Sequence, residues 1–239
     1  HSLLVERGSR RVVPQRYWRV PTATAKMDAR EAAQALVDQL RHSVGQRMIA
    51  DVPLGAFLSG GVDSSAVVAT MAGLSPSPVH TCAIGFDDPR FDESAYAQMV
   101  ADRYQTDHRL EVVQSDDFDL IDTLAWLYDE PYADSSAIPT YRVCQMARKH
   151  VTVALSGDGG DESLGGYRRY RMHLGEEGVR ARLPHGLRRP LFGALGQIYP
   201  KADWAPRMFR AKTTFEGMAR SSVEAYFHSI SILRGPMRE

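Results

Sequence analysis

The sequence predicts an α/β fold with a doubly wound, mainly parallel sheet and helices on its flanks. Three observations predict it. Short apolar strand-like runs alternate with helical patterns of ten or more residues, and such alternation implies right-handed crossovers between parallel strands. Two glycine-rich loops, at 59–61 and 156–160, each follow directly on a strand-like run. Since ligands bind beyond the carboxyl ends of the strands in such sheets, both loops fall where a ligand site is expected.

The amino-terminal part contains a hairpin pattern followed by a helix. Residues 1–20 predict two short strands around a Gly-Ser turn. After Pro21, Asp28 and Glu31 have the spacing of a capping box, which predicts the start of a helix there. Helical periodicity predicts one buried face for this helix, formed by Leu36, Val37, Leu40, Val44 and Met48.

The central part supplies the expected sheet. Apolar runs bounded by turn residues predict strands at 52–58, 79–86, 109–113 and 151–155. Between them, helical patterns predict a helix over 63–72 that ends at Gly73, one capped by Asp92, and further helices over about 116–128 and 137–149.

Beyond about residue 166 this pattern weakens. Residues 167–212 contain 11 Lys or Arg against 3 Asp or Glu, with prolines at 184, 190, 200 and 206. We expect an irregular, partly helical, basic segment there. The predicted organisation is therefore a tail or linker at 1–20, a main domain at 21–170 and a carboxyl-terminal segment at 171–239.

Charge and composition exclude several classes of partner. Lys plus Arg and Asp plus Glu number 29 each, so no net field attracts nucleic acid or an anionic membrane. No apolar run reaches the length of a membrane span and no signal peptide is visible, so we expect a cytoplasmic protein without membrane or nucleic-acid partners. Cys82 and Cys144 stand in apolar contexts without metal-ligand spacing, which predicts buried, reduced thiols.

The first glycine-rich loop has the chemistry of a phosphate site. The amino terminus of a helix has unpaired N–H groups and the positive end of its dipole, and Gly60 and Gly61 leave those amides open to an oxyanion. Ser59, Ser64 and Ser65 add hydroxyl groups. The loop is neither a Walker A motif nor a G-x-G-x-x-G fingerprint. A tight strand-to-helix turn with Asp63 as a simple N-cap is the alternative interpretation.

A longer set of motifs carries a resemblance to a known family. Ser-Gly-Gly-x-Asp-Ser at 59–64 resembles the pyrophosphate loop of the ATP pyrophosphatase (PP-loop) superfamily, which implies an adenine nucleotide alpha-hydrolase-like fold. Within that superfamily the chain resembles the C-terminal synthetase domain of the glutamine-hydrolysing asparagine synthetase family. The resemblance covers about residues 50–170, and residues 1–20 resemble the last strands of the glutaminase domain that precedes it. The motifs that carry it are V-P-L-G-A-F-L-S-G-G-V-D-S-S (52–65), C-A-I-G-F (82–86), F-D-E-S-A-Y-A (91–97), D-E-P-Y-A-D-S-S-A-I-P-T-Y (129–141) and A-L-S-G-D-G-G-D-E-S-L-G-G-Y (154–167).

The resemblance implies roles for individual residues. Those expected to contact ATP are Leu58, Ser59, Gly60, Gly61, Asp63, Ser64, Ser65, Ile84, Ser156 and Gly157. Asp63 and Asp161 would hold Mg²⁺, and for Asp161 a helix N-cap is the alternative. Asp158 stands where many relatives carry glutamate and would face the acyl acceptor or the incoming amine. The expected catalytic residues are therefore Asp63, Asp158 and Asp161.

The turn at 129–135 has two interpretations. Its polar residues are Asp129, Glu130, Asp134 and Ser135. Either their side chains border the same cleft, or the segment is an ordinary turn in which they cap the backbone.

The activity implied by the resemblance is ATP-dependent amide formation. Aspartate would be adenylated to β-aspartyl-AMP with release of pyrophosphate, and ammonia from a glutaminase domain of the same parent chain would complete asparagine. A homodimer is also expected. The alternatives are a related amidotransferase or β-lactam-forming synthetase acting on another carboxylate, or a non-catalytic nucleotide-binding domain. The family's amino-terminal cysteine nucleophile and its later lysine are not matched in these 239 residues, so we expect a fragment that is incomplete as a catalyst by itself.

Overall fold

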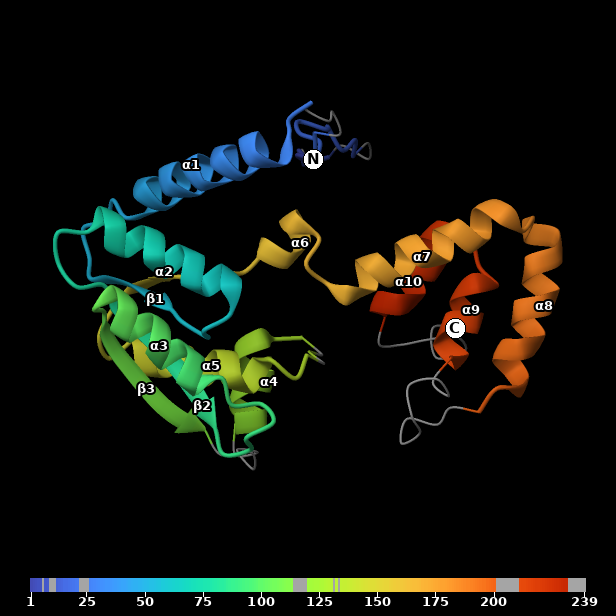
Figure 1. The fold of residues 1–239 in the computed structure, drawn as a ribbon. Coiled ribbons are helices and arrows are strands. Elements are labelled where there is room, and N and C mark those ends of the chain that lie inside the picture. The colour runs from blue at the N-terminus through green and yellow to red at the C-terminus, as the bar shows by residue number, and fades with distance from the viewer. Residues whose placement is uncertain are drawn as a thin grey trace.

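A computed structural model describes residues 1–5, 7–8, 12–21, 26–113, 120–130, 132, 134–200 and 211–231 (Figure 1). The elements follow one another as α1 (Ala29–Arg47), β1 (Leu54–Phe57), α2 (Val62–Leu74), β2 (His80–Phe86), α3 (Ser94–Tyr104), β3 (Asp107–Val113), α4 (Ile121–Tyr128), α5 (Ala137–Ala147), β4 (Val153–Leu155), α6 (Gly160–Leu164), α7 (Arg168–Arg182), α8 (His185–Ile198), α9 (Lys212–Met218) and α10 (Ser222–Ile230).

The four strands form one parallel sheet in the order β3-β2-β1-β4. Gly55 of β1 lies opposite His80 of β2 on one side and opposite Ala154 of β4 on the other. The chain builds outward from β1 to β3 and then returns to place β4 beside β1. The order therefore reverses between β1 and β4, and this reversal is the topological switch point of the sheet. The predicted doubly wound, parallel α/β fold is confirmed.

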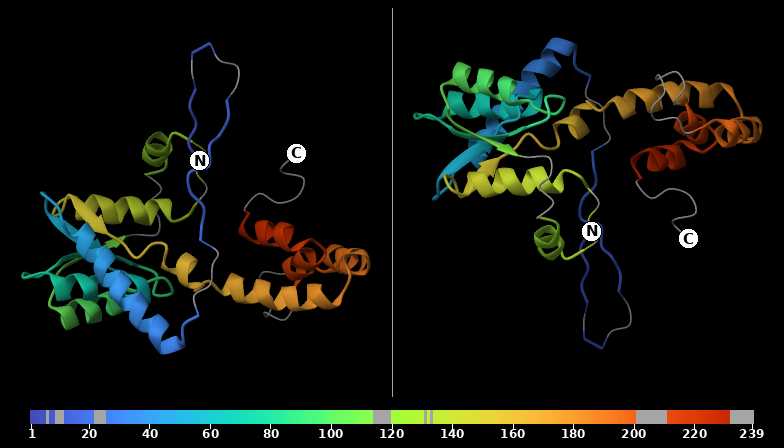
Figure 2. Two further views of the ribbon diagram at one scale, coloured as in Figure 1. Left: turned by 90° about the horizontal axis from the view of Figure 1, so that it is seen from above. Right: turned by 90° about the horizontal axis from the view of Figure 1, so that it is seen from below.

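Helices cover both faces of the sheet. α1, α2 and α3 lie on one face and α5 lies on the other (Figures 1 and 2). Neighbouring residues of β2 alternate between the two layers, as strand geometry requires: Ala83 packs with Val68 and Met71 of α2, whereas Cys82 packs with Met146 of α5. The sheet thus separates two apolar cores, one on the side of α2 and one on the side of α5.

The α2 core should dominate stability. Met71 is 1% exposed, whereas Met99 on α3 is 67% exposed. We expect Met71→Ala to lower the free energy of unfolding by about 3 kcal/mol, because it removes buried area and leaves a cavity. The matched control Met99→Ala should change it by less than about 0.5 kcal/mol. Urea titration measures both values, and equal losses in the two variants would contradict this packing.

The expectation of helices in the carboxyl-terminal segment is confirmed, but 168–198 and 212–230 are more regular than expected, since they are helical apart from short turns. Arg188 of α8 is buried and donates to the carbonyl groups of Met218 and Arg220, at 2.6 Å for the second. Pro184 is the N-cap residue of α8, so this proline begins a helix instead of breaking one. In Figure 1 these helices lie beyond α6, on the side away from α1–α3.

Several local predictions also need correction. Residues 1–20 contain one antiparallel bridge, between Ser2 and Gln15, among their described residues. The capping box of Asp28 and Glu31 is confirmed, but Leu36 and Val37 are exposed because α1 packs only through its later turns. Cys82 is buried as expected, whereas Cys144 is exposed.

Some helix ends also differ from those expected. Gly73 lies inside α2, and the N-cap residue of α3 is Glu93 instead of Asp92. The predicted start of a helix at 116 lies outside the described residues. Within the described part of the chain, no helix is both long enough and apolar enough to cross a membrane.

Candidate active site

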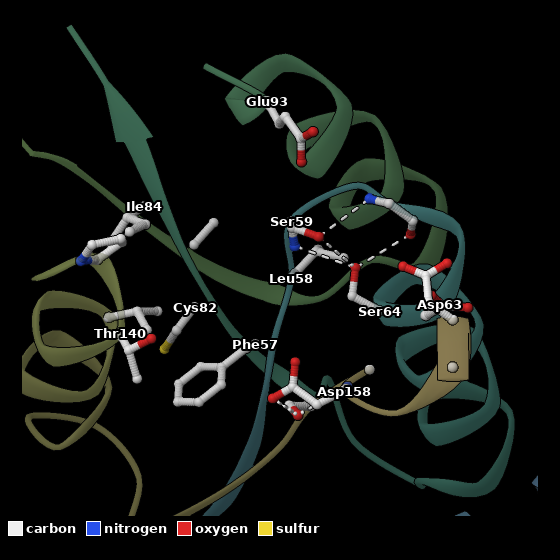
Figure 3. A pocket seen from close by; sticks show the side chains of 18 of the residues that line it. Phe57, Leu58, Ser59, Asp63, Ser64, Cys82, Ile84, Glu93, Thr140 and Asp158 are labelled. Atoms are coloured by element: carbon white, nitrogen blue, oxygen red, sulfur yellow. Dashed lines mark hydrogen bonds between the residues drawn. The ribbon is translucent and has the colours of Figure 1, made fainter. Parts of the chain in front are cut away.

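A pocket of about 820 Å³ opens at the carboxyl edge of the sheet, over β1, β2 and β4 (Figure 3). Its volume lies in the range of small-molecule sites, and it stands at the switch point of the sheet. Its walls are formed by Phe57, Leu58, Ser59, Gly61, Asp63, Ser64, Cys82, Ala83, Ile84, Phe86, Phe91, Glu93, Pro139, Thr140, Val143, Ser156, Gly157, Asp158, Gly159, Gly160, Asp161, Glu162 and Tyr167. Of the residues that the sequence predicts for the site, all but Gly60 and Ser65 are among them.

The first glycine-rich loop joins β1 to α2. The amide of Leu58 still donates to the carbonyl of Cys82 at 2.9 Å, so the sheet continues up to the loop. Gly60 then takes a φ of +79°, and a Cβ there would lie 2.6 Å from the amide nitrogen of Ala97, so glycine is required. The loop therefore packs directly against the first turn of α3.

The start of α2 leaves its amides available to a ligand. Gly61 is the N-cap residue and offers no side chain to cap the helix. Asp63 is the second residue of α2 and is not its cap, so the interpretation of Asp63 as a simple N-cap is wrong. An uncapped helix amino terminus that borders a pocket is suited to an anion.

The loop serines hold one another in place. The Ser64 hydroxyl donates to the carbonyl of Gly61 at 3.2 Å and lies 3.0 Å from the Ser59 hydroxyl, which accepts from the Gly61 amide at 3.3 Å (Figure 3). Ser65 lies one residue further along α2, and its buried hydroxyl has no hydrogen-bond partner among the described residues. Ser59 and Ser64 thus border the pocket, whereas Ser65 does not.

The second glycine-rich loop interlocks with the first. A Cβ on Gly157 would lie 2.6 Å from the amide nitrogen of Ser64, and one on Gly160 would lie 2.6 Å from Oδ1 of Asp63. Side chains at these two positions would force the loops apart. Ser156 donates its hydroxyl to Asp158 at 2.8 Å, which fixes that carboxylate at the rim. The sequence places both loops at strand ends, and the structure joins them into one surface.

Asp161 occupies in α6 the place that Asp63 occupies in α2. Its helix has Gly159 as the N-cap residue, at φ +89°, and Asp161 is the second helical residue. Its carboxylate lies so close to Gly166 that a Cβ there would overlap it. Asp161 is therefore not a helix cap either. Both aspartates line the same pocket without capping a helix.

These two carboxylates fit one mode of magnesium binding. Among the described residues, no group of three or more His, Cys, Asp or Glu side chains forms a complete metal site. Mg²⁺ usually takes one or two carboxylates and completes its shell with water and substrate phosphate oxygens. Asp63 and Asp161 match that donor set only if the ligand brings phosphates.

Comparison with known proteins identifies the family. Residues 35–236 match the family described as asparagine synthase. The chain belongs to the asparagine synthase family. It is 44% identical over 168 residues to a Methanocaldococcus jannaschii protein named "Putative asparagine synthetase (glutamine-hydrolyzing) 2", covering 70% of this chain and 32% of that protein.

Two further relatives carry similar names. Asparagine synthetase (glutamine-hydrolyzing) 1 of Bacillus subtilis is 39% identical over 64% of this chain and 24% of its own length. A Mycobacterium bovis protein named "Putative asparagine synthetase (glutamine-hydrolyzing)" is 37% identical over 87% of this chain and 31% of its own length. The chain thus spans about a quarter to a third of the length of these members of the asparagine synthase family.

In this family member, the apolar end of the pocket includes residues to which the sequence assigns no role in the site. Pro139, Thr140 and Val143 of α5 line it together with Phe57 and Ile84. Val143 packs in the same apolar cluster as Phe57 and Ile84, and Figure 3 shows Thr140, Phe57 and Ile84 at this end. Cys82 also lies here, and burial raises the pKa of its thiol. The spacing of 139, 140 and 143 marks one helical face, but only the fold shows that this face borders the site.

The described residues of the turn at 129–135 do not line the pocket. None of its four polar side chains is among the lining residues. Asp134 instead accepts a 2.9 Å hydrogen bond from the amide of Ser136, and hydrogen bonding to Ser136 lowers its pKa. The interpretation as a capped turn holds for Asp134.

The pocket is strongly acidic. Its described lining contains the carboxylates of Asp63, Glu93, Asp158, Asp161 and Glu162 but no Lys, Arg or His. Anionic ligands are repelled by such a wall unless cations accompany them. Binding of a phosphate ligand in this pocket therefore requires cations that these lining side chains do not supply, such as a metal ion that accompanies the ligand.

Proposed function

We propose that this chain is the ATP-using, amide-forming synthetase part of an asparagine synthetase-like enzyme. It adenylates a carboxylate, aspartate by first choice, to an acyl-AMP with release of pyrophosphate, and ammonia then displaces AMP to give the amide. The observation that carries the proposal is the pair of interlocked glycine-rich loops at the switch point, with Asp63 and Asp161 beside an uncapped helix amino terminus. Membership of the asparagine synthase family supports it.

Each part of the pocket has a role in this proposal. The amides at the start of α2 and the Ser59 hydroxyl bind the pyrophosphate as it leaves, which stabilises developing charge by oriented donors. Ser156 and Gly157 contact the nucleotide from the other side, and Leu58 and Ile84 border the adenine. Asp63 and Asp161 would hold Mg²⁺, which, when bound, neutralises phosphate oxyanions. Asp158 faces the acceptor or the incoming amine.

The partners are also part of the proposal. The names of the relatives specify glutamine hydrolysis, so we propose that a glutaminase domain supplies the ammonia. We further propose a homodimer in the cytoplasm, where the free thiols of Cys82 and Cys144 stay reduced. Another carboxylate acceptor, as in a related amidotransferase or a β-lactam-forming synthetase, is the second candidate. The shorter Asp158 in place of glutamate favours it.

Product analysis tests the proposed reaction. The full-length protein that contains this chain is incubated with Mg²⁺, ATP, ammonium and one of aspartate, glutamate or malate, and phosphorus NMR follows the nucleotide. We expect AMP and pyrophosphate in equal amounts, with aspartate giving the fastest reaction. Formation of ADP and inorganic phosphate would contradict cleavage between the α and β phosphates. A faster reaction with another acceptor would favour the second candidate.

A further inference from the structure

The segment from Phe91 to Ser94 lies over the pocket and has no role in the proposed reaction. Phe91 and Glu93 line the pocket, whereas Asp92 and Ser94 point to the end of β2 and do not line it. Phe91 and Glu93 thus face the pocket, whereas Asp92 and Ser94 face the end of β2, at the turn that leads into α3.

Asp92 fixes the segment in place. Its Oδ1 accepts hydrogen bonds from the amides of Phe86, at 3.3 Å, and Ser94, at 3.1 Å, and its Oδ2 accepts from the Ser94 hydroxyl at 2.8 Å. These hydrogen bonds, chiefly those from Ser94, lower the pKa of the carboxyl group. A Cβ on Gly85 would lie 3.0 Å from Oδ1, so the carboxylate fits closely against β2. Asp92 therefore ties the end of β2 to the start of α3.

Glu93 stands beside the first glycine-rich loop. Its carbonyl group accepts from the amides of Tyr96 and Ala97, the two residues that pack on Gly60. Figure 3 shows its side chain extending from the start of α3 on the side of Ser59. Among the described residues, no cation and no hydrogen-bond donor contacts the Glu93 carboxylate. The pocket thus contains an acceptor group that the protein itself leaves unused.

The position of Glu93 indicates which group it meets. In the proposed binding mode the phosphates lie at Ser59 and Ser64 and the base lies against the apolar wall at Phe57 and Ile84. The ribose must span the interval between them, where the start of α3 borders the pocket. A carboxylate repels phosphate, but it accepts strong charge-assisted hydrogen bonds from neutral hydroxyl groups. Acidic residues read the ribose hydroxyls of dinucleotides in the same way in other α/β folds.

A magnesium ion is a less suitable partner for this carboxylate. Asp63 and Asp161 come from α2 and α6, whereas Glu93 comes from α3, and no group of three or more acidic, His or Cys side chains forms among the described residues. We propose that Glu93 is a specificity-determining residue that accepts hydrogen bonds from the 2′- and 3′-hydroxyl groups of the ribose, and that Asp92 positions it. This inference rests on the proposed function.

Deoxynucleotides test the inference directly. Calorimetry with Mg²⁺ gives the dissociation constants of ATP, 2′-deoxy-ATP and 3′-deoxy-ATP for the wild type, Glu93→Gln and Glu93→Ala. We expect the wild type to prefer ATP over each deoxynucleotide by about tenfold or more, as for a hydrogen bond to a charged group. Glu93→Ala removes both hydrogen bonds, so it should weaken ATP more than either deoxynucleotide, each of which keeps one of the two hydroxyl groups. The preference for ATP should thereby be abolished, with Glu93→Gln intermediate. Asp88→Ala is the matched control, because Asp88 pairs with Arg90 at 2.6 Å in the same connection and does not line the pocket.

The outcomes separate this inference from the proposed function. If the wild type binds ATP and the deoxynucleotides equally, or if Glu93→Ala keeps the preference, Glu93 does not read the ribose, although the chain still binds nucleotide. If the wild type binds none of the three, both the inference and the proposed function are wrong. The circular dichroism spectrum of each variant is compared with that of the wild type. We expect the spectra to agree, because Glu93 is exposed.

Discussion

Asp161→Asn is expected to weaken magnesium-dependent binding of ATP by about a hundredfold. This factor corresponds to about two to three kcal/mol of binding free energy, lost because the neutral asparagine attracts Mg²⁺ less than the carboxylate does. The asparagine keeps the size of the side chain and its fit against Gly166, and α6 loses no cap because Gly159 occupies that position. The thermal midpoint should therefore change little. ATP titrations at several Mg²⁺ concentrations, with a melting curve for each variant, measure both effects, and Asp63→Asn should behave in the same way.

Asp158→Asn is the matched control for these two variants. Asp158 borders the same pocket but is engaged by the Ser156 hydroxyl, and the proposal gives it a role toward the acceptor. Its replacement should leave the dependence of ATP binding on Mg²⁺ unchanged. If Asp63→Asn and Asp161→Asn instead melt at markedly lower temperature and bind Mg-ATP normally, the two aspartates are structural and the assignment fails.

Gly157→Ala is expected to abolish nucleotide binding and to lower the free energy of unfolding by about 1–3 kcal/mol. The new Cβ would lie 2.6 Å from the amide nitrogen of Ser64 and 2.8 Å from the carbonyl carbon of Asp63. Both are backbone atoms of α2, which cannot turn aside as a side chain can, so the two loops must separate. Calorimetry with Mg-ATP and urea titration measure the two losses.

Gly73→Ala is the control for this glycine substitution. In the part of the chain that the structure describes, no atom lies within 4 Å of a Cβ at that position in the last turns of α2. Alanine there should raise the free energy of unfolding slightly, because it is the better helix former, and should leave binding unchanged. Unimpaired binding by Gly157→Ala would show that the interlocked loops are not needed for the site.

The fold could be predicted from the sequence because its signals are local. The change from strand-like to helical period, and the glycines that follow strands, are visible in any window of the chain. The carboxyl-terminal helices are harder to predict, because they are held against one another by polar contacts between residues far apart in the sequence. Arg188, for example, joins α8 to carbonyl groups of Met218 and Arg220 some thirty residues away, and no local pattern marks such a contact.

The site was predictable where residue type alone carries the chemistry. Ser59, Gly61, Asp63 and the loop at 156–161 line the pocket as their pattern predicts. The sequence does not place the α5 wall in the pocket, because a helical face does not reveal which neighbour it meets. The role of Asp63 was ambiguous because a cap and a ligand differ by a shift of two residues in the start of the helix, and only the structure places that start at Val62.

The most direct measurement of the central claim is calorimetry of the 239-residue chain with Mg²⁺ and α,β-methylene-ATP, an analogue that cannot release pyrophosphate. We expect one molecule of the analogue to bind per chain in a magnesium-dependent manner. Gly61→Val should abolish this binding and leave the melting temperature of the chain nearly unchanged. Gly61 lines the pocket, and among the described residues only the Ser59 hydroxyl, at 3.3 Å, lies near a Cβ placed there, so valine should fill the space proposed for the phosphate and not that of the core. Equal binding by the wild type and Gly61→Val would show that the pocket between the two loops is not the phosphate site.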